Sequence, residues 1–90
     1  MRKSTVLLKL IRSGKFHIVR PYYKHQEDMM KYGFTFDALT NDDELVVTCL
    51  VNGERVQAHR IIEEYGQLLF IHNFNQKTYS FDEVVSLEIL

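Results

Sequence analysis

Four histidines are the side chains of this sequence best suited to acid–base chemistry near neutral pH, because an unperturbed imidazole titrates between pH 5 and 8. Two of them, His59 and His72, face each other across a predicted hairpin if its loop is the two residues Tyr65–Gly66. A three-residue loop, which we favour, places them on opposite faces of the sheet. We therefore expect His17, His25, His59 and His72 to be ordinary surface or edge residues, with a small histidine-dependent hydrolase as a distant alternative.

The sequence has one cysteine, Cys49, which alternates with Val47 and Val51. This spacing predicts a small buried apolar side chain, since a reactive thiolate needs exposure and a cationic neighbour. A single cysteine forms no internal disulfide, and no Cys or His spacing is typical of structural zinc. The four glycines are not spaced as in a phosphate-binding loop. We predict no catalytic residue, no metal site and no cofactor, and no small-molecule substrate is evident.

Charge is divided unevenly along the chain. The 11 lysines and arginines and the 12 aspartates and glutamates give a net charge of −1. Residues 1–25 hold seven of the cations and no acid, so they carry +7; residues 26–90 hold the other four cations and all 12 acids, so they carry −8. Such asymmetry predicts an electrostatic partner. We expect an acidic protein partner, or self-association in which the two parts face each other across the fold or a homodimer.

Aromatic residues are interleaved with the basic ones in residues 15–24. Base stacking combined with phosphate contacts requires this mixture, so a nucleic-acid-binding module is the alternative function. A half-buried strand must turn at least one of Phe16, Ile18 and Tyr22 inward, which favours the structural interpretation. The predicted partner-binding residues are Arg2, Lys3, Lys9, Arg12, Lys15, Arg20, Tyr22, Tyr23 and Lys24.

Short acidic runs occur at three predicted turns. They are residues 42–44, 63–64 and 82–83. We expect them to be solvated, as charged residues usually are. A cation site and an acidic contact patch are the alternatives.

The elements that position these side chains begin with a predicted helix. Ninety residues indicate one domain, 1–90. The apolar residues among Val6–Ile11 occupy one broad arc of a helical wheel, and Gly14 follows, which predicts a helix over about residues 4–13. A strand over the same residues is the rival, because its apolar residues also alternate.

A strand over about residues 15–21 follows, because this run is rich in β-formers and ends at Pro21. Residues 24–44 are the least regular part. A structureless loop of that length is unusual in a compact domain, so we predict a short helix near 25–32 and a short strand at 34–36.

Residues 45–90 are predicted to form a β-meander. Asn52–Gly53 after a β-branched run is the strongest short hairpin signal. Its two-residue loop predicts that Val51 lies opposite Glu54, Cys49 opposite Val56 and Val47 opposite Ala58.

Three further features complete the meander. A three-residue loop at Gly66 sets Ile62 opposite Leu68, and Arg60 opposite Phe70. Residues 75–77 form a turn, and Asp82 begins a 3₁₀ turn before a last strand from Val84. A helix over 54–65 is the rival, because Ala58, Ile61, Ile62 and Tyr65 are helically spaced.

The predicted register defines a core face and a mixed face. The core face holds Leu45, Val47, Cys49, Val51, Val56, Ala58, Ile62, Leu68 and Phe70, with Val85, Leu87 and Ile89 of the last strand. The apolar residues of the mixed face are Val46, Leu50, Ile61 and Ile71.

The predicted fold class is α+β, mainly β. A helix, a first strand, a hairpin-linked meander, a 3₁₀ turn and a closing strand resemble the pattern of small SH3-like or Sm-like barrels, or of a strongly bent antiparallel meander. The resemblance covers about two thirds of the chain and carries over no functional residue.

These observations predict a small non-enzymatic interaction protein, a regulator or inhibitor that works by surface charge and shape. Compact chains of this kind are frequent among phages and other mobile elements. The lone cysteine fits a reducing compartment, and the charged residue Lys9 interrupts the apolar run of a signal-like start. No stretch reaches the roughly 18 apolar residues of a membrane span. We expect a cytoplasmic protein with no membrane partner.

Overall fold

The computed structural model describes residues 1–22, 33–42 and 46–90, with the backbone alone for 20–22. Within them lie one helix, eight strands and one 3₁₀ turn. The elements are α1 (Lys3–Arg12), β1 (Phe16–Tyr22), β2 (Thr35–Thr40), β3 (Val47–Val51), β4 (Glu54–Ala58), β5 (Arg60–Glu64), β6 (Gln67–His72), β7 (Asn75–Ser80), η1 (Phe81–Glu83) and β8 (Leu87–Ile89).

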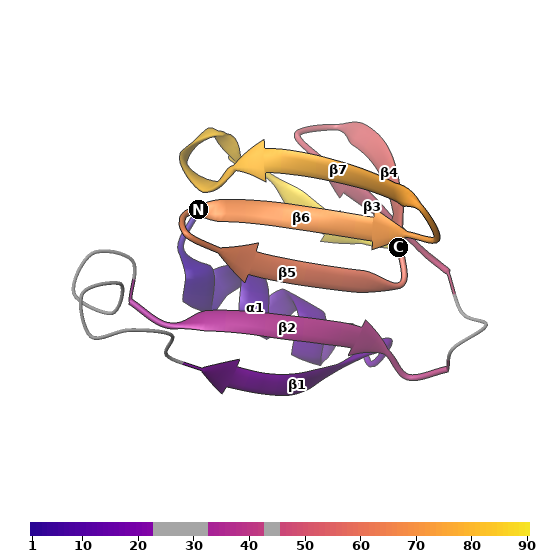
Figure 1. Cartoon of the computed structure of the whole chain (residues 1–90). Helices are drawn as coiled ribbons and strands as arrows, with labels where there is room; N and C mark the ends of the chain where they lie inside the picture. Colours follow the sequence, from indigo (N-terminus) through magenta and orange to yellow (C-terminus); the bar gives the residue numbers. More distant parts are fainter. Residues whose placement is uncertain (23–32, 43–45) are drawn as a thin grey trace.

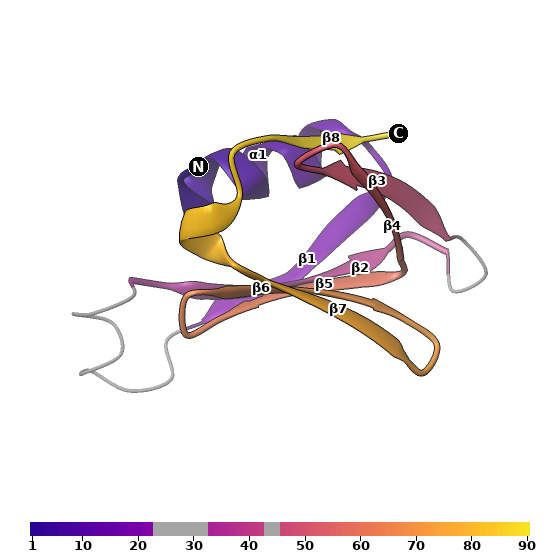
Figure 2. The same cartoon turned by 90° about the horizontal axis from the view of Figure 1, so that it is seen from above.

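The strands form two antiparallel sheets. Sheet A has the order β1-β2-β5-β6-β7, and sheet B has the order β4-β3-β8. Helix α1 and sheet B lie on the same side of sheet A (Figures 1 and 2). The core fills the space between them, where Phe36, Phe70 and Leu87 are buried. The fold is therefore α+β and mostly antiparallel, as predicted, but the sheets do not close into a barrel, and the SH3-like detail is not confirmed.

Helix α1 is confirmed within one residue of its predicted bounds. Val6 and Leu10 are fully buried, and Leu7 packs against the core. The predicted apolar arc is wider than the buried stripe, because Leu8 and Ile11 are 46% and 52% exposed. A helix against one surface buries only the residues one turn apart on one side. Two large aliphatic side chains therefore face solvent.

Strands β1 and β2 pair along their length, with a register irregularity between Ile18 and Arg20. Phe16 is buried, so the predicted inward side chain of β1 is confirmed. Strand β2 is longer than the predicted strand at 34–36. The sequence did not predict the full strand because Asp37 lies in its middle, and a carboxylate is unfavourable there on its own. In the fold, Asp37 is paired with Arg60 of β5 at 2.6 Å. The short helix predicted at 25–32 lies outside the described residues.

The hairpin at Asn52–Gly53 is confirmed. Both residues have positive φ, 52° and 82°, and all three predicted strand pairs occur in the β3–β4 register. The rival helix over 54–65 is wrong, because these residues form β4 and β5.

The second hairpin differs from its prediction by one residue. Its loop is Tyr65–Gly66, so Ile62 lies opposite Leu69 and Arg60 opposite Ile71. The chain leaves sheet B and enters sheet A at His59, whose carbonyl oxygen accepts a hydrogen bond from the Thr40 backbone. The prediction continued one alternation of inward and outward side chains from β4 into β5, and the crossing at His59 interrupts this alternation.

The shifted register exchanges side chains between the two faces of β5. Ile61 and Glu63 point into the core, and Ile62 points outward, so the predicted core position of Ile62 is wrong. A shift of one residue always exchanges the faces of a strand.

The C-terminal region also departs from its prediction. The turn predicted at 75–77 is instead Asn73–Phe74, and residues 75–80 form β7. A 3₁₀ turn is present, but it begins at Phe81, one residue before the predicted Asp82. It resets the alternation that follows, so Val84 is buried and Val85 is 77% exposed. Val85 is therefore not a core residue, and the last strand begins at Leu87. No helix in the described ranges is long and apolar enough to cross a membrane.

Candidate functional site

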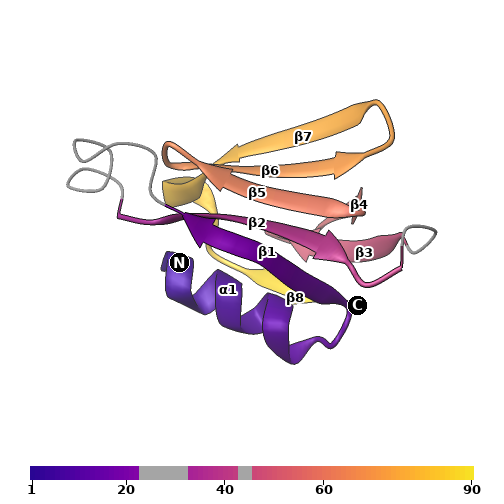
Figure 3. The same ribbon diagram turned by 60° about the horizontal axis from the view of Figure 1, so that its bottom comes forward.

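The exposed side of α1 collects part of the predicted basic surface. Arg2 and Arg12 are exposed and Lys9 is half-buried, and none of them forms an ion pair with another described residue. Leu8 and Ile11 lie on the same helix. We call Arg2, Leu8, Lys9, Ile11 and Arg12 the basic helix surface. Figure 3 shows α1 lying outside β1 and β8.

Lys3 belongs to the interior instead. Its Nζ lies 2.9 Å from Oε1 of Glu63, which is fully buried, and donates a hydrogen bond to the Phe34 carbonyl oxygen at 3.0 Å. The Gly66 backbone also donates to Glu63 Oε1, while Glu63 Oε2 has no hydrogen-bond partner. The prediction that Glu63 is a solvated turn residue is therefore wrong. Lys3 joins the basic and acidic parts of the chain within the fold.

The remaining predicted residues are divided. Lys15 Nζ donates a hydrogen bond to the backbone carbonyl oxygen of Leu90. Arg20 and Tyr22 lie in β1, where only the backbone is described, and Tyr23 and Lys24 lie outside the described residues. The buried ring of Phe16 offers no stacking surface for a base.

His59 and His72 come together, because the hairpin loop has two residues. Their ring centroids lie 6.2 Å apart, with planes at 74°. The Asn73 backbone donates a hydrogen bond to His59 Nδ1 at 3.4 Å, and Asn73 Nδ2 lies 3.2 Å from His72 Nε2. Asn73 thus contacts one nitrogen of each ring. Among the described residues, no three His, Cys, Asp or Glu side chains are grouped to hold a metal ion.

Cys49 is buried in sheet B, as predicted. Burial raises the pKa of its thiol to about 12, and the charge of Lys15 opposes this shift more weakly. The thiol is therefore protonated and shielded at neutral pH, which is the environment of an inert structural cysteine.

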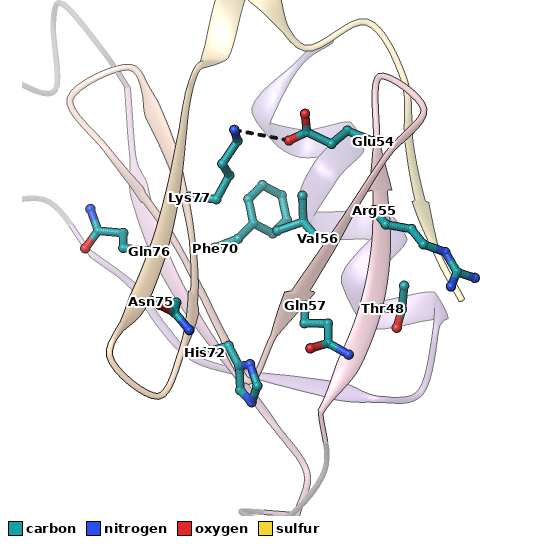
Figure 4. Close-up of a pocket in the computed structure, with 10 residues that line it drawn as sticks. All are labelled: Thr48, Glu54, Arg55, Val56, Gln57, Phe70, His72, Asn75, Gln76 and Lys77. Carbon is teal, nitrogen blue, oxygen red and sulfur yellow. Dashed lines mark ion pairs between the residues drawn. The ribbon is translucent and has the colours of Figure 1, made fainter.

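A cleft of about 500 Å³ lies where sheets A and B diverge (Figure 4). Its walls are residues 54–57 of β4 and 75–77 of β7, with Phe70 and His72 of β6 and Thr48 of β3. This cleft was not predicted from the sequence, because residues 75–77 of β7 were assigned to a turn and the walls of the cleft come from separate hairpins.

An ion pair spans the cleft from one sheet to the other. Lys77 Nζ lies 3.3 Å from Glu54 Oε1, and the Tyr79 hydroxyl donates a hydrogen bond to the same carboxylate. These hydrogen bonds, first from Tyr79 and then from Lys77, lower the pKa of Glu54. Burial and the Glu54 carboxylate raise the pKa of Tyr79 to about 12. The carboxylate of Glu54 is thus ionised and already occupied.

The mixed face of the prediction is not one surface in the structure. Val46 and Leu50 belong to the sheet B side, Ile71 lies in sheet A, and Ile61 is buried. One face of sheet A is covered by no described element, and we call it the uncovered face. It carries Leu39, Ile62, Leu69 and Ile71 around the Asp37–Arg60 pair.

Comparisons with protein families, with curated proteins and with solved structures find no match for this chain.

Proposed function

We propose that this protein is a non-enzymatic interaction protein, a regulator or inhibitor acting in the cytoplasm, that binds an acidic macromolecular partner through the basic helix surface. The observation that carries the proposal is the exposure of Leu8 and Ile11 on the helix that also carries Lys9 and Arg12, with Arg2 at its N-cap. Residues 1–25 contain no acid that would neutralise these cations locally.

This composition suits a binding surface. Fully burying a leucine or isoleucine contributes about 1.5–3 kcal/mol, and half of each side chain remains available for that gain. Cations at the edge of an apolar contact steer an acidic partner and increase the association rate. Leu8 and Ile11 supply the contact, and Arg2, Lys9 and Arg12 supply the steering.

The cations have a second, local effect that the experiment must separate. Lys9 and Arg12 lie in the last turn of α1, where positive charge stabilises the helix dipole by about 0.3–1 kcal/mol each. Reversing their charge therefore weakens the helix slightly. A Lys9→Gln/Arg12→Gln variant removes the positive charge without adding negative charge. It is the neutral control between the parent and the charge-reversal variant.

The test compares the immobilised protein with its Lys9→Glu/Arg12→Glu and Leu8→Ser/Ile11→Ser variants in extracts of the native host. Bound proteins are quantified by mass spectrometry, and the candidate partner is then purified for titration. We expect one acidic protein that is lost with both variants and kept by Val85→Ser, a control at a 77% exposed side chain outside α1 and outside the cleft. A partner that all four proteins bind equally would contradict the proposal.

Titration with duplex DNA and with RNA at two salt concentrations tests the nucleic-acid alternative. Phosphate contacts make affinity fall steeply as salt rises. Tight binding that weakens steeply with salt and is lost in Lys9→Glu/Arg12→Glu would show that the partner is a nucleic acid and not a protein. We expect no such binding, because no described aromatic side chain accompanies the cations of the basic helix surface.

A further inference from the structure

The two sheets end in four edge strands, and two of these are protected. β1 has a bulge between Ile18 and Arg20 and contains Pro21, and β8 has three residues. Bulges, proline and short length are the usual means of preventing an edge from pairing with another chain. β4 and β7 have five and six residues, continuous register and no proline. Both of these open edges line the cleft.

The unpaired backbone groups of β4 point away from β3. Opposed residues in an antiparallel pair alternate between hydrogen-bonded and non-hydrogen-bonded positions. The Thr48 carbonyl oxygen accepts its hydrogen bond from Leu90, on the far side of β3, at 2.9 Å. Gln57, opposite Thr48, is therefore in a non-hydrogen-bonded pair, as is Arg55 two residues earlier. Their N–H and C=O groups lie on the edge that faces the cleft.

The same reasoning applies to β7. The Ile71 carbonyl oxygen accepts a hydrogen bond from the His59 backbone at 2.9 Å, so Ile71 bonds toward β5. Gln76, opposite Ile71, is therefore in a non-hydrogen-bonded pair of the β6–β7 hairpin. Thr78 occupies the equivalent position two residues further on. Each wall of the cleft thus offers backbone donors and acceptors without a strand partner among the described residues.

The charges of the cleft favour an acidic occupant. Arg55 is exposed and forms no ion pair with any described residue, and Lys77 is a second cation. The one carboxylate, Glu54, is already bound by Lys77 and Tyr79. An incoming carboxylate would therefore meet an unpaired guanidinium. The side-chain amides of Gln57, Asn75 and Gln76 add further polar contacts around the cleft (Figure 4).

We propose that the cleft between β4 and β7 binds an extended acidic peptide segment of a partner protein as an added β-strand. Main-chain hydrogen bonds to an open edge provide affinity in this mode of recognition, and the flanking side chains provide specificity. The added strand pairs with the open edge of β4, next to Arg55, and extends sheet B. This site lies on β4, β6 and β7, apart from the basic helix surface, and does not depend on the function proposed for α1.

The test selects peptides on the full-length protein from a displayed library of random eight-residue segments. A selected peptide is then synthesised and titrated by amide hydrogen exchange. We expect the selected sequences to be enriched in Asp and Glu and depleted in Pro. Exchange at the Arg55 and Gln57 amides should slow at least tenfold at saturation. N-methylation of alternate peptide amides should abolish binding.

Two variants separate strand addition from simple charge attraction. Arg55→Glu should weaken the affinity for the selected peptide at least tenfold. Gln57→Pro removes an edge N–H that makes no bond within sheet B, a position where proline is tolerated, and it should also abolish binding while the fold remains intact. Lys9→Glu/Arg12→Glu, which tests the basic helix surface, should bind the peptide as the parent does.

Three results would overturn the proposal. One is a library with no enrichment. Another is a set of selected peptides that bind Arg55→Glu and Gln57→Pro as tightly as the parent. The third is protection confined to amides outside β4. Because the helix variants and the cleft variants are measured separately, failure of this site leaves the proposal for α1 unaffected.

Discussion

At the residue scale, the ion pair between Lys3 and Glu63 ties the start of the helix to the centre of sheet A. Glu63 is fully buried and the Lys3 side chain is 17% exposed, with the two charged atoms 2.9 Å apart. Sequence alone did not indicate this pair, since Glu63 precedes a turn and its inward orientation depends on the register of β5. Buried ion pairs contribute little net stability, but losing one partner leaves an uncompensated charge.

Lys3→Met is therefore expected to destabilise the protein by about 3–5 kcal/mol in chemical denaturation. The double variant Lys3→Met/Glu63→Leu removes both charges and should recover most of that loss. A single variant within about 0.5 kcal/mol of the parent would show that water compensates the charge of Glu63 in the folded protein.

Cys49 provides a prediction about pH at the same scale. Its thiol has a pKa of about 12 in the folded protein, raised by burial from 9.0. Between these values the folded state keeps a proton that the unfolded state releases, so stability falls as pH rises above 9, by at most about 1.4 kcal/mol per pH unit. Cys49→Ala should have a shallower loss of stability from pH 9 to 11 than the parent. Equal slopes of stability against pH in the parent and in Cys49→Ala would show that a group other than Cys49 causes the loss.

At the element scale, local turn chemistry was predictable and the crossing between sheets was not. The hairpin at Asn52–Gly53 follows from two adjacent residues that tolerate positive φ, and its register follows from its loop length. At His59 the chain changes sheets, and this break depends on hydrogen bonds to β2 and β6 that no local pattern reveals. The errors in β5 follow from this crossing and from the two-residue loop at Tyr65–Gly66.

Gly53→Val tests the first hairpin. The residue has a φ of 82°, and an added Cβ would meet no atom within 4 Å, so the cost comes from backbone conformation and not from a clash. We expect a loss of more than about 1 kcal/mol, because β-branched residues avoid this conformation. Gly53→Asn, which tolerates positive φ, should lose clearly less. Equal losses would indicate a steric cause instead.

Ile61 and Ile62 test the corrected register of β5. Ile61 is fully buried, and Ile62 lies on the uncovered face of sheet A. Ile61→Asp should unfold the protein or cost several kcal/mol, since it buries an unpaired charge, whereas Ile62→Asp should leave a folded protein. Thermal and chemical denaturation of the two variants provide the comparison. If Ile62→Asp were the more destabilising variant, the predicted register with a three-residue loop would be correct instead.

At the scale of the whole molecule, charge segregation was visible in the sequence, but the arrangement of the charges was not. The sum of +7 over residues 1–25 treats every cation as free. In the fold Lys3 pairs with Glu63, and Lys15 binds the Leu90 carbonyl oxygen. The cleft between β4 and β7 was also not predictable from the sequence, because it forms only when the two sheets are placed next to each other. Arg2, Lys9 and Arg12 are the described cations of this segment that remain for a partner.

Whether that partner is a second copy of the chain is decided by the salt dependence of its mass in solution. Exposed charges interact over about 30 Å at 0.01 M salt and about 8 Å at 0.15 M, so an association between basic and acidic surfaces must weaken between these conditions. Because the fold already pairs Lys3 with Glu63 internally, we expect a monomer at both salt concentrations in analytical ultracentrifugation. A dimer at low salt that Lys9→Glu/Arg12→Glu abolishes would instead assign the basic helix surface to self-association. A dimer that this variant keeps would move the interface to the uncovered face of sheet A, where Ile62→Asp should then disrupt it.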